Sequence, residues 1–318
     1  MSPTRRNGVL ALAGLLGWGG LAWLAVTMFN ASPRTAAFDL ELLLDAGRAL
    51  AAGQSPYEPS MVAGATPGAT DLFYSYPPPV AQAMSLVAAL PSGAMFAALW
   101  MAAIAGLIAS AGLVARRLAV PTVALAPFYL PLGIALLFGN LDALFPFAYG
   151  LVLVAALSTG RAPRIAGGVA LALAAVAKVH PGSLGLWFAG RAVRERLDGR
   201  PPRAALVVGA AVGTGLAVLI LSLVAGGTEL WRDYVPVAGA ASGARLLDAR
   251  NAGPAAQVAL ALGGDEALVR TLHLAVAAAA LLATLGAALA IRDSLTSLAV
   301  AAVASLVVLP VTWYHYPV

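Results

Sequence analysis

Long uncharged apolar segments are the feature that most constrains this chain. A helix rises about 1.5 Å per residue, so about 20 apolar residues cross the hydrocarbon core of a bilayer. Hydrophobic residues occupy 61% of the 318 positions and charged residues only 10%, whereas soluble domains carry about 25% charged residues. The sequence therefore predicts an all-α polytopic membrane protein. The candidate spans are 9–29, 93–115, 121–138, 141–158, 164–178, 204–225, 268–291 and 294–311.

Two further apolar segments are too short to cross a bilayer comfortably. As a helix, residues 79–90 cover only about 18 Å, which indicates a re-entrant or packed half-helix before the span at 93–115. Residues 180–190 are also short, but the parity of the neighbouring spans requires a crossing there. We therefore expect about nine spans in a single integral membrane domain, residues 1–318. A retained first span is predicted at 9–29, and a cleaved signal peptide is the alternative.

The distribution of charge predicts the orientation. If the N-terminus is cytoplasmic, 12 of the 19 basic residues fall in inside loops and 11 of the 14 acidic residues fall outside, as the positive-inside rule requires. The net charge of +5 therefore indicates a membrane topology and no nucleic-acid partner. The composition, rich in Ala, Gly, Arg and Pro, is typical of a bacterial genome. We expect the bacterial cytoplasmic membrane, with long external loops at 30–78 and 229–266.

Several chemistries are excluded before any motif is considered. The sequence has no cysteine, which excludes disulfides, thiolate nucleophiles and zinc–thiolate sites. It contains no Walker A, HExxH, GxSxG or Rossmann glycine motif, so nucleotide-driven transport and the commonest hydrolase mechanisms have no support. The unusual polar elements collect on the predicted external face, which favours a single site there.

The first external loop concentrates carboxylates beside the first span. Residues 38–53 predict an amphipathic helix lying on the external surface, in which Asp45 and Arg48 are spaced to pair and Gly53 fits a C-terminal cap. Asp39 stands at the start of this helix, close to the point where the first span leaves the bilayer. It is either a functional carboxylate or an acid favoured by the helix dipole.

Other polar residues stand at the ends of predicted spans. Tyr76 precedes three prolines, which force an extended approach to the next helix, and a structural corner is the simplest explanation. Asn140 and Asp142 lie in a turn between two spans; they are either a polar turn or a functional pair near membrane level, where an unpaired carboxylate is costly.

Lys178 ends a long apolar run and His180 follows it, just before a helix-breaking proline. A lysine at that depth requires an anion, either a carboxylate or a phosphate, unless it snorkels to the headgroups. His315 stands between two tyrosines after Trp313 and is either functional or structural. His273 begins a later span, where a structural role is favoured.

These residues together resemble a known family. Four elements of the sequence carry the resemblance: Phe38-Asp39, Ala46–Leu50 with Gly53, Pro56–Pro59 and Tyr76–Pro79. They are similar to elements of the polyprenol-phosphate-mannose-dependent mannosyltransferases of glycosyltransferase family 87. These enzymes belong to the membrane-embedded GT-C class. The mycobacterial phosphatidylinositol-mannoside mannosyltransferases are members. The resemblance extends to Gly139-Asn140, Lys178–Pro181, Asn251 after Tyr234-Val235-Pro236, and Trp313-x-His315.

The resemblance implies a GT-C-like bundle with an interfacial helix in its first external loop and an inverting transfer at the external face. Asp39 would be the general base, and His315 would lie close to the base or the donor phosphate. No metal or cofactor is implied. The other residues that it implies for substrate binding are Lys178, His180, Arg48, Asn140, Asp142, Arg245, Arg250, Asn251, Tyr76 and Trp313. Because relatives continue through further spans after the His315 motif, a C-terminally truncated member is also implied.

The expected function is therefore transfer of mannose from polyprenyl-phosphate-mannose to a glycolipid or lipoglycan, with membrane lipids around the protein. The alternative is a non-catalytic membrane protein that binds or transports lipid-linked sugars, or one that keeps the fold as a scaffold. A transporter is expected to place ionisable residues near the middle of the bilayer, whereas here they collect at one face. The acceptor, the exact sugar and the oligomeric state stay open.

Overall fold

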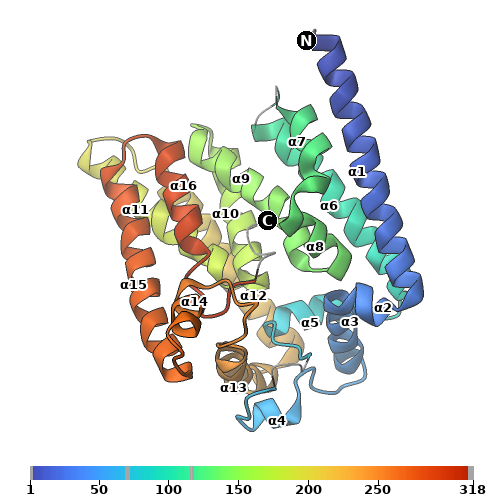
Figure 1. Cartoon of the computed structure of the whole chain (residues 1–318). Coiled ribbons are helices and arrows are strands. Elements are labelled where there is room, and N and C mark those ends of the chain that lie inside the picture. Colours follow the sequence, from blue (N-terminus) through green and yellow to red (C-terminus); the bar gives the residue numbers. More distant parts are fainter. Residues whose placement is uncertain (1–2, 69–71, 115, 117, 314–318) are drawn as a thin grey trace.

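The computed structural model describes residues 3–68, 72–114, 116 and 118–313, and all regular elements in these residues are helices. They form a bundle of longer helices with a layer of short helices at one end (Figure 1). The layer lies at the end where the first helix, α1 (Pro3–Ala31), finishes. It consists of α2 (Pro33–Ala36), α3 (Phe38–Ala51), α4 (Pro59–Val62), α5 (Pro78–Ser85), α13 (Glu229–Gly243) and α14 (Pro254–Ala261).

Within the described residues, four helices are long and apolar enough to cross a membrane. They are the Asn7–Ala31 part of α1, α6 (Ser92–Val114), α12 (Ala205–Gly226) and α15 (Glu266–Ala290). The polytopic helical class predicted from the sequence is thereby confirmed.

The predicted span at 121–138 is not one straight helix. It consists of α7 (Ala119–Leu125), a 3₁₀ turn (Ala126–Phe128) and α8 (Leu130–Phe138), with a bend of 66° between the two halves. Pro127 and Pro131 lie in the first turns of the 3₁₀ and α8 elements, where each removes a backbone donor and starts a new helix. If this bent pair crosses as one unit, the described chain has up to five such spans.

The remaining predicted crossings form shorter helices. They are α9 (Phe145–Leu157), α10 (Arg161–Ala177), α11 (Leu184–Leu197) and α16 (Ser294–Ser305), with 3₁₀ turns at Leu141–Leu144 and His180–Ser183. Their lengths of 12 to 17 residues are below the usual membrane span. The total of about nine spans stays a prediction.

Small residues and a buried tryptophan hold the bundle together. In α10, a Cβ at Gly168 would come within 2.5 Å of the Val207 carbonyl oxygen of α12, so glycine permits the close crossing of the two helices. Trp187 of α11 is 1% exposed and donates a 2.8 Å hydrogen bond to Ser297 of α16. In the apolar interior these contacts specify which helices are neighbours.

The short-helix layer has its own core around α3. Leu43 and Leu44 are completely buried, and Gly47 packs so closely on α5 that a Cβ would meet the Met84 carbonyl carbon at 2.6 Å. The helix therefore packs into the layer by its apolar face, while Asp45 and Arg48 keep 43% and 40% of their side chains exposed. Its position at the external surface stays a prediction. Its local features are confirmed, because Arg48 pairs with Asp45 at 2.9 Å and Gly53 follows the helix with a φ of +74°.

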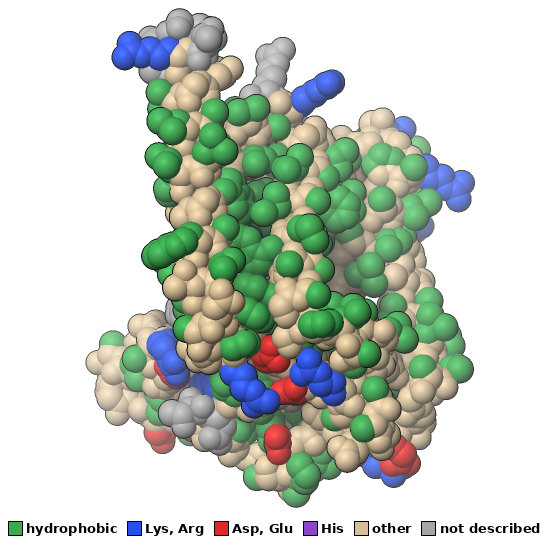
Figure 2. Space-filling model, turned by 90° about the vertical axis from the view of Figure 1, so that its right-hand side faces the viewer, with side chains coloured by type: hydrophobic (Ala, Val, Ile, Leu, Met, Phe, Trp, Pro, Cys, Tyr) green, Lys and Arg blue, Asp and Glu red, His purple; other side chains and the backbone are tan. Residues whose placement is uncertain are grey.

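On the face drawn in Figure 2, charged side chains lie above and below a band of apolar side chains. Lys and Arg occur at the upper rim and again in the lower part, where the acidic side chains also gather. An apolar band between two charged ends is the surface that a bilayer requires. The orientation of the chain in the membrane stays a prediction.

Candidate active site

A cavity of about 690 Å³ lies where the short-helix layer meets the bundle. Its walls come from segments that are far apart in the sequence: the start of α3, residues 72–77, residues 138–140, the end of α10, α13, and the segments 244–250 and 309–313. Of the residues predicted for substrate binding or catalysis, the cavity is lined by Asp39, Tyr76, Asn140, Lys178, Arg245, Arg250 and Trp313.

Asp39 is held by an amide from another part of the chain. Its Oδ2 accepts a hydrogen bond of 2.6 Å from Nδ2 of Asn140. Gly139, with a φ of +67°, ends α8 in the left-handed conformation, and a Cβ there would lie 2.6 Å from Cβ of Leu40. Glycine therefore allows the end of α8 to approach α3 closely enough for Asn140 to reach Asp39.

Asn140 is itself fixed by the turn that follows it. It is 3% exposed, and its Oδ1 accepts a 2.9 Å hydrogen bond from the backbone N–H of Asp142, as the N-cap of the 3₁₀ turn at Leu141–Leu144. Because its oxygen is engaged in this way, its amide nitrogen faces Asp39. Asn140 thus positions the carboxylate, which adds to the substrate-binding role predicted from the sequence.

The environment of Asp39 raises its pKa to about 6, from an ordinary value of 3.8. Burial is the largest cause, because it disfavours the ionised form, and the hydrogen bond from Asn140 opposes it. Lys178 and Arg245 also lower this pKa, while the carboxylate of Asp142 raises it. A carboxylate with a pKa of about 6 is largely ionised at neutral pH and is still basic enough to accept a proton.

This environment predicts the pH dependence of the reaction. If Asp39 is the base, kcat/KM should rise with pH through a midpoint near 6, because the carboxylate must be ionised. In Asn140→Ala the carboxylate loses a hydrogen bond that favours its ionised form, so the midpoint should move to higher pH. The profile of Gln82→Ala, which removes an amide bonded to the Ser222 carbonyl oxygen, should match the wild type. An unchanged midpoint in Asn140→Ala would contradict the assignment of Asp39.

Lys178 and Asp142 form a buried ion pair beside this carboxylate. The distance from Nζ of Lys178 to Oδ2 of Asp142 is 2.8 Å, and their side chains are 9% and 0% exposed. Lys178 is the C-cap residue directly after α10, and it is one of the residues that line the cavity. Of the two anions predicted for this lysine, the structure provides the carboxylate.

Two arginines and two aromatic rings form another part of the cavity wall. The Arg245 guanidinium lies 5.4 Å from the ring centre of Phe73 and 5.8 Å from that of Trp313. Arg250 lies 5.8 Å from the same tryptophan ring and forms hydrogen bonds of 2.7 and 2.9 Å with Asp248. Arginines stacked on aromatic rings in a cavity present N–H groups to an anion with little loss of side-chain freedom.

The backbone at Arg245 is strained, with a φ of +61°, the only positive value at a residue other than glycine in the part of the chain that the structure describes. Such a conformation costs about 1–3 kcal/mol and is typical of functional sites. Asn251 holds the segment in place: its Nδ2 donates to the carbonyls of Leu246 and Pro310, and its Oδ1 accepts from the N–H groups of Gly253 and Thr312. Asn251 is fully buried and is not among the residues that line the cavity.

The other predicted residues lie around the cavity or away from it. The Tyr76 carbonyl accepts a 3.0 Å hydrogen bond from the Tyr57 hydroxyl, which fixes the extended segment before α5. His180 is buried with its ring centre 6.3 Å from that of Phe145, and Arg48 bonds to Asp45, the Ala88 carbonyl and Ser92. Neither is among the described residues that line the cavity. His315 lies outside the described residues.

Aromatic residues of the cavity wall were missed by the sequence argument. Phe73 stacks with Arg245, and Tyr234 of α13 packs 5.9 Å from the ring of Tyr57. The cluster Phe73–Tyr76 beside three prolines is the signal that could have indicated an aromatic wall. Among the described residues, no three His, Asp or Glu side chains are placed as metal ligands.

Comparison with known proteins connects this geometry with one family. The family model of glycosyltransferase family 87 matches residues 74–312. This range includes Asn140, Lys178 and both arginines of the cavity, and it begins after Asp39. No curated protein and no solved structure gives a significant match.

Proposed function

Because the chain belongs to glycosyltransferase family 87 and is a multi-pass membrane glycosyltransferase, we propose that its donor is polyprenyl-phosphate-mannose and its acceptor a glycolipid or lipoglycan. We place the reaction at the external face of the bacterial cytoplasmic membrane, with the N-terminus in the cytoplasm. The observation that carries the proposal is one cavity that contains a carboxylate with a pKa of about 6 and two aromatic-stacked arginines.

Asp39 acts as the base on the acceptor. It removes the proton from the acceptor hydroxyl while that oxygen forms a bond to the anomeric carbon of the sugar. The bond between this carbon and the phosphate oxygen breaks, and its electron pair leaves with the polyprenyl phosphate. Because a single attack from the opposite face occurs, the configuration at the anomeric carbon is inverted. Base assistance of this kind contributes about 10²–10⁴-fold to the rate.

Arg245 and Arg250 stabilise the departing phosphate. The sequence predicted a carboxylate or a phosphate as the partner of Lys178, and the structure gives it the buried carboxylate of Asp142 at 2.8 Å. Arg250 also pairs with a carboxylate, Asp248, but its side chain lines the cavity and is 61% exposed, so a phosphate can reach its remaining N–H groups. The arginines line the same cavity and stack on the ring of Trp313, and guanidinium groups match the geometry of phosphate oxygens. Lys178 contributes through Asp142 and Asn140, which together hold Asp39.

The test of the proposal is a transfer assay with the purified protein. Radiolabelled polyprenyl-phosphate-mannose is offered with a panel of membrane glycolipids, and the same panel is tested with polyprenyl-phosphate-arabinose and with GDP-mannose. Transfer from the lipid-linked mannose alone supports the proposal. Transfer from polyprenyl-phosphate-arabinose would show that the donor carries another sugar. Transfer from GDP-mannose would overturn the proposal of a lipid-phosphate donor. Donor binding without transfer would favour a non-catalytic carrier.

The arginine assignment predicts a defect in donor use. Arg250→Gln and Arg245→Gln should each raise the KM for the donor and lower kcat, with a combined loss in kcat/KM of about 10²-fold, because charge on the leaving phosphate is less well stabilised. Steady-state kinetics with varied donor measure this effect. Arg232→Gln is the matched control, since Arg232 is 73% exposed on α13 and pairs with Glu229. Equal kinetics in all three variants would exclude the two arginines from phosphate binding.

A further inference from the structure

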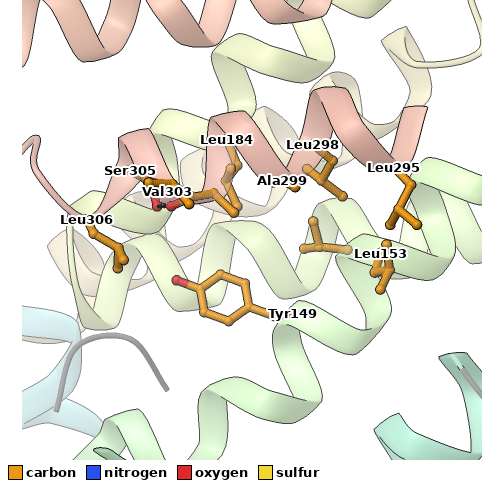
Figure 3. A pocket seen from close by; sticks show the side chains of 11 residues that line it. Tyr149, Leu153, Leu184, Leu295, Leu298, Ala299, Val303, Ser305 and Leu306 are labelled. Carbon is orange, nitrogen blue, oxygen red and sulfur yellow. Dashed lines mark hydrogen bonds between the residues drawn. The ribbon is translucent and has the colours of Figure 1, made fainter. Parts of the chain in front are cut away.

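A second cavity, of about 360 Å³, lies between α9, α11 and α16 (Figure 3). Its walls are apolar except at the hydroxyl groups of Tyr149 and Ser305, and Ser305 donates its hydrogen bond to the Ala302 carbonyl. Leu295 and Val303 at its edge are 54% and 68% exposed. The cavity is therefore open along the side of the bundle, where its edge is apolar.

Two segments of the chain run from the wall of this apolar cavity to the wall of the polar one. Leu306 lines the apolar cavity, and Leu309, three positions later, lines the polar cavity. In the same way Leu184 lines the apolar cavity and Val179, just before the turn at His180–Ser183, lines the polar one. Figure 3 shows the Tyr149 hydroxyl directed toward the end occupied by Leu306. That end therefore leads toward the polar cavity.

We propose that the apolar cavity binds the hydrocarbon chain of the lipid-phosphate donor, in the part nearest to the phosphate. This inference rests on the proposed function, which places the phosphate at the arginines of the polar cavity. A chain that continues from this phosphate needs an apolar space next to the polar cavity, and the open edge lets the rest of the chain extend into the bilayer. The hydroxyl groups of Tyr149 and Ser305 would lie at the end of the apolar cavity that is nearer to the donor phosphate.

The physical basis is steric fit. A lipid chain that moves from the bilayer into a protein cavity leaves an apolar solvent, so association depends on packing and not on water release. Side chains that fill the cavity should therefore act by excluding the chain. A larger side chain that overpacks the cavity should weaken binding of the lipid chain roughly tenfold.

Photocrosslinking tests the location without requiring catalysis. The probe is a polyprenyl phosphate with a diazirine on an isoprene unit close to the phosphate, and the labelled peptides are identified by mass spectrometry. We expect labels on Leu153, Leu298 or Ala302, and we expect unlabelled polyprenyl phosphate to compete while phosphatidylglycerol does not. Labels confined to α1 or α12 would overturn the proposal. Equal competition by phosphatidylglycerol would also overturn it, because the cavity would then be a general lipid site.

Cavity-filling variants test the consequence for the reaction. Ala302→Phe should raise the KM for a long-chain donor roughly tenfold and leave the KM for a short, water-soluble isoprenyl donor almost unchanged. Ala279→Phe is the control, because Ala279 is exposed on α15 and is not among the cavity residues. Equal effects on both donors in Ala302→Phe would contradict the proposal. If neither donor is used by the wild type, the proposed function fails, and crosslinking still decides whether the chain occupies the cavity.

Discussion

Asp39→Asn is expected to lower the transfer rate by about 10²–10⁴-fold, because asparagine cannot accept the proton of the acceptor hydroxyl. The replacement has almost the same shape, so binding of the donor should change little. The loss should therefore fall in kcat, measured at saturating donor and acceptor with the radiolabel assay. The same variant should lose the acidic limb of the pH profile near pH 6, since that limb reports the ionisation of this carboxyl group.

A matched control is available on the same helix. Asp45 also belongs to α3, but it pairs with Arg48 at 2.9 Å and is not among the described residues that line the polar cavity. Asp45→Asn should keep transfer close to that of the wild type. If Asp39→Asn transfers as fast as this control, the base is another group, and a scaffold role for the chain becomes the better explanation.

Lys178→Met is expected to destabilise the protein by about 3–5 kcal/mol, because it leaves the carboxylate of Asp142 buried without its charged partner. The Asp142 side chain is completely buried and the lysine nearly so, so water cannot replace the lost interaction. The measurement is thermal unfolding of the detergent-solubilised protein. The double variant Lys178→Met with Asp142→Asn removes both charges and should recover a large part of the lost stability.

The same pair of variants separates two roles for Lys178. If the lysine mainly holds Asp142, stability falls, and the donor KM of the surviving folded protein changes little. If it binds the donor phosphate instead, Lys178→Met should raise the donor KM strongly while the unfolding temperature stays constant. Arg232→Met is the control for stability, because the Arg232–Glu229 pair is largely exposed and should contribute little.

Local features were predictable from the sequence because they depend on neighbouring residues. The class of protein follows from apolar segments alone, since only helices satisfy the backbone of a spanning chain without an edge. The pairing of Asp45 with Arg48 and the cap at Gly53 were also predictable, because each depends on residues within one or two turns. The hypothesis that Asp39 is the base also came from the sequence, from its position beside the first span and the resemblance of the surrounding residues, and it stays a prediction.

The surroundings of the helix at residues 38–51 illustrate what such reasoning leaves open. Its pattern predicted an amphipathic helix, but only the fold shows that α5, α6 and α8 pack against it. Asp45 and Arg48 keep 43% and 40% of their side chains exposed. Likewise, the hydropathy of 121–138 gave one span, whereas prolines at 127 and 131 bend it by 66°. Hydropathy averages over a window and does not detect where the backbone changes direction.

By itself, the sequence determined that this chain is a helical membrane protein, where the helix after its first span forms, and which carboxylate stands at the start of that helix. Only the tertiary structure decided what surrounds that carboxylate. Asn140 is 101 positions away from Asp39, Lys178 is 36 positions away from Asp142, and the arginines come from a third region. The physical reason is that the pKa of a buried group depends on every charge and dipole within a few ångströms, and these neighbours are selected by helix packing and not by sequence distance.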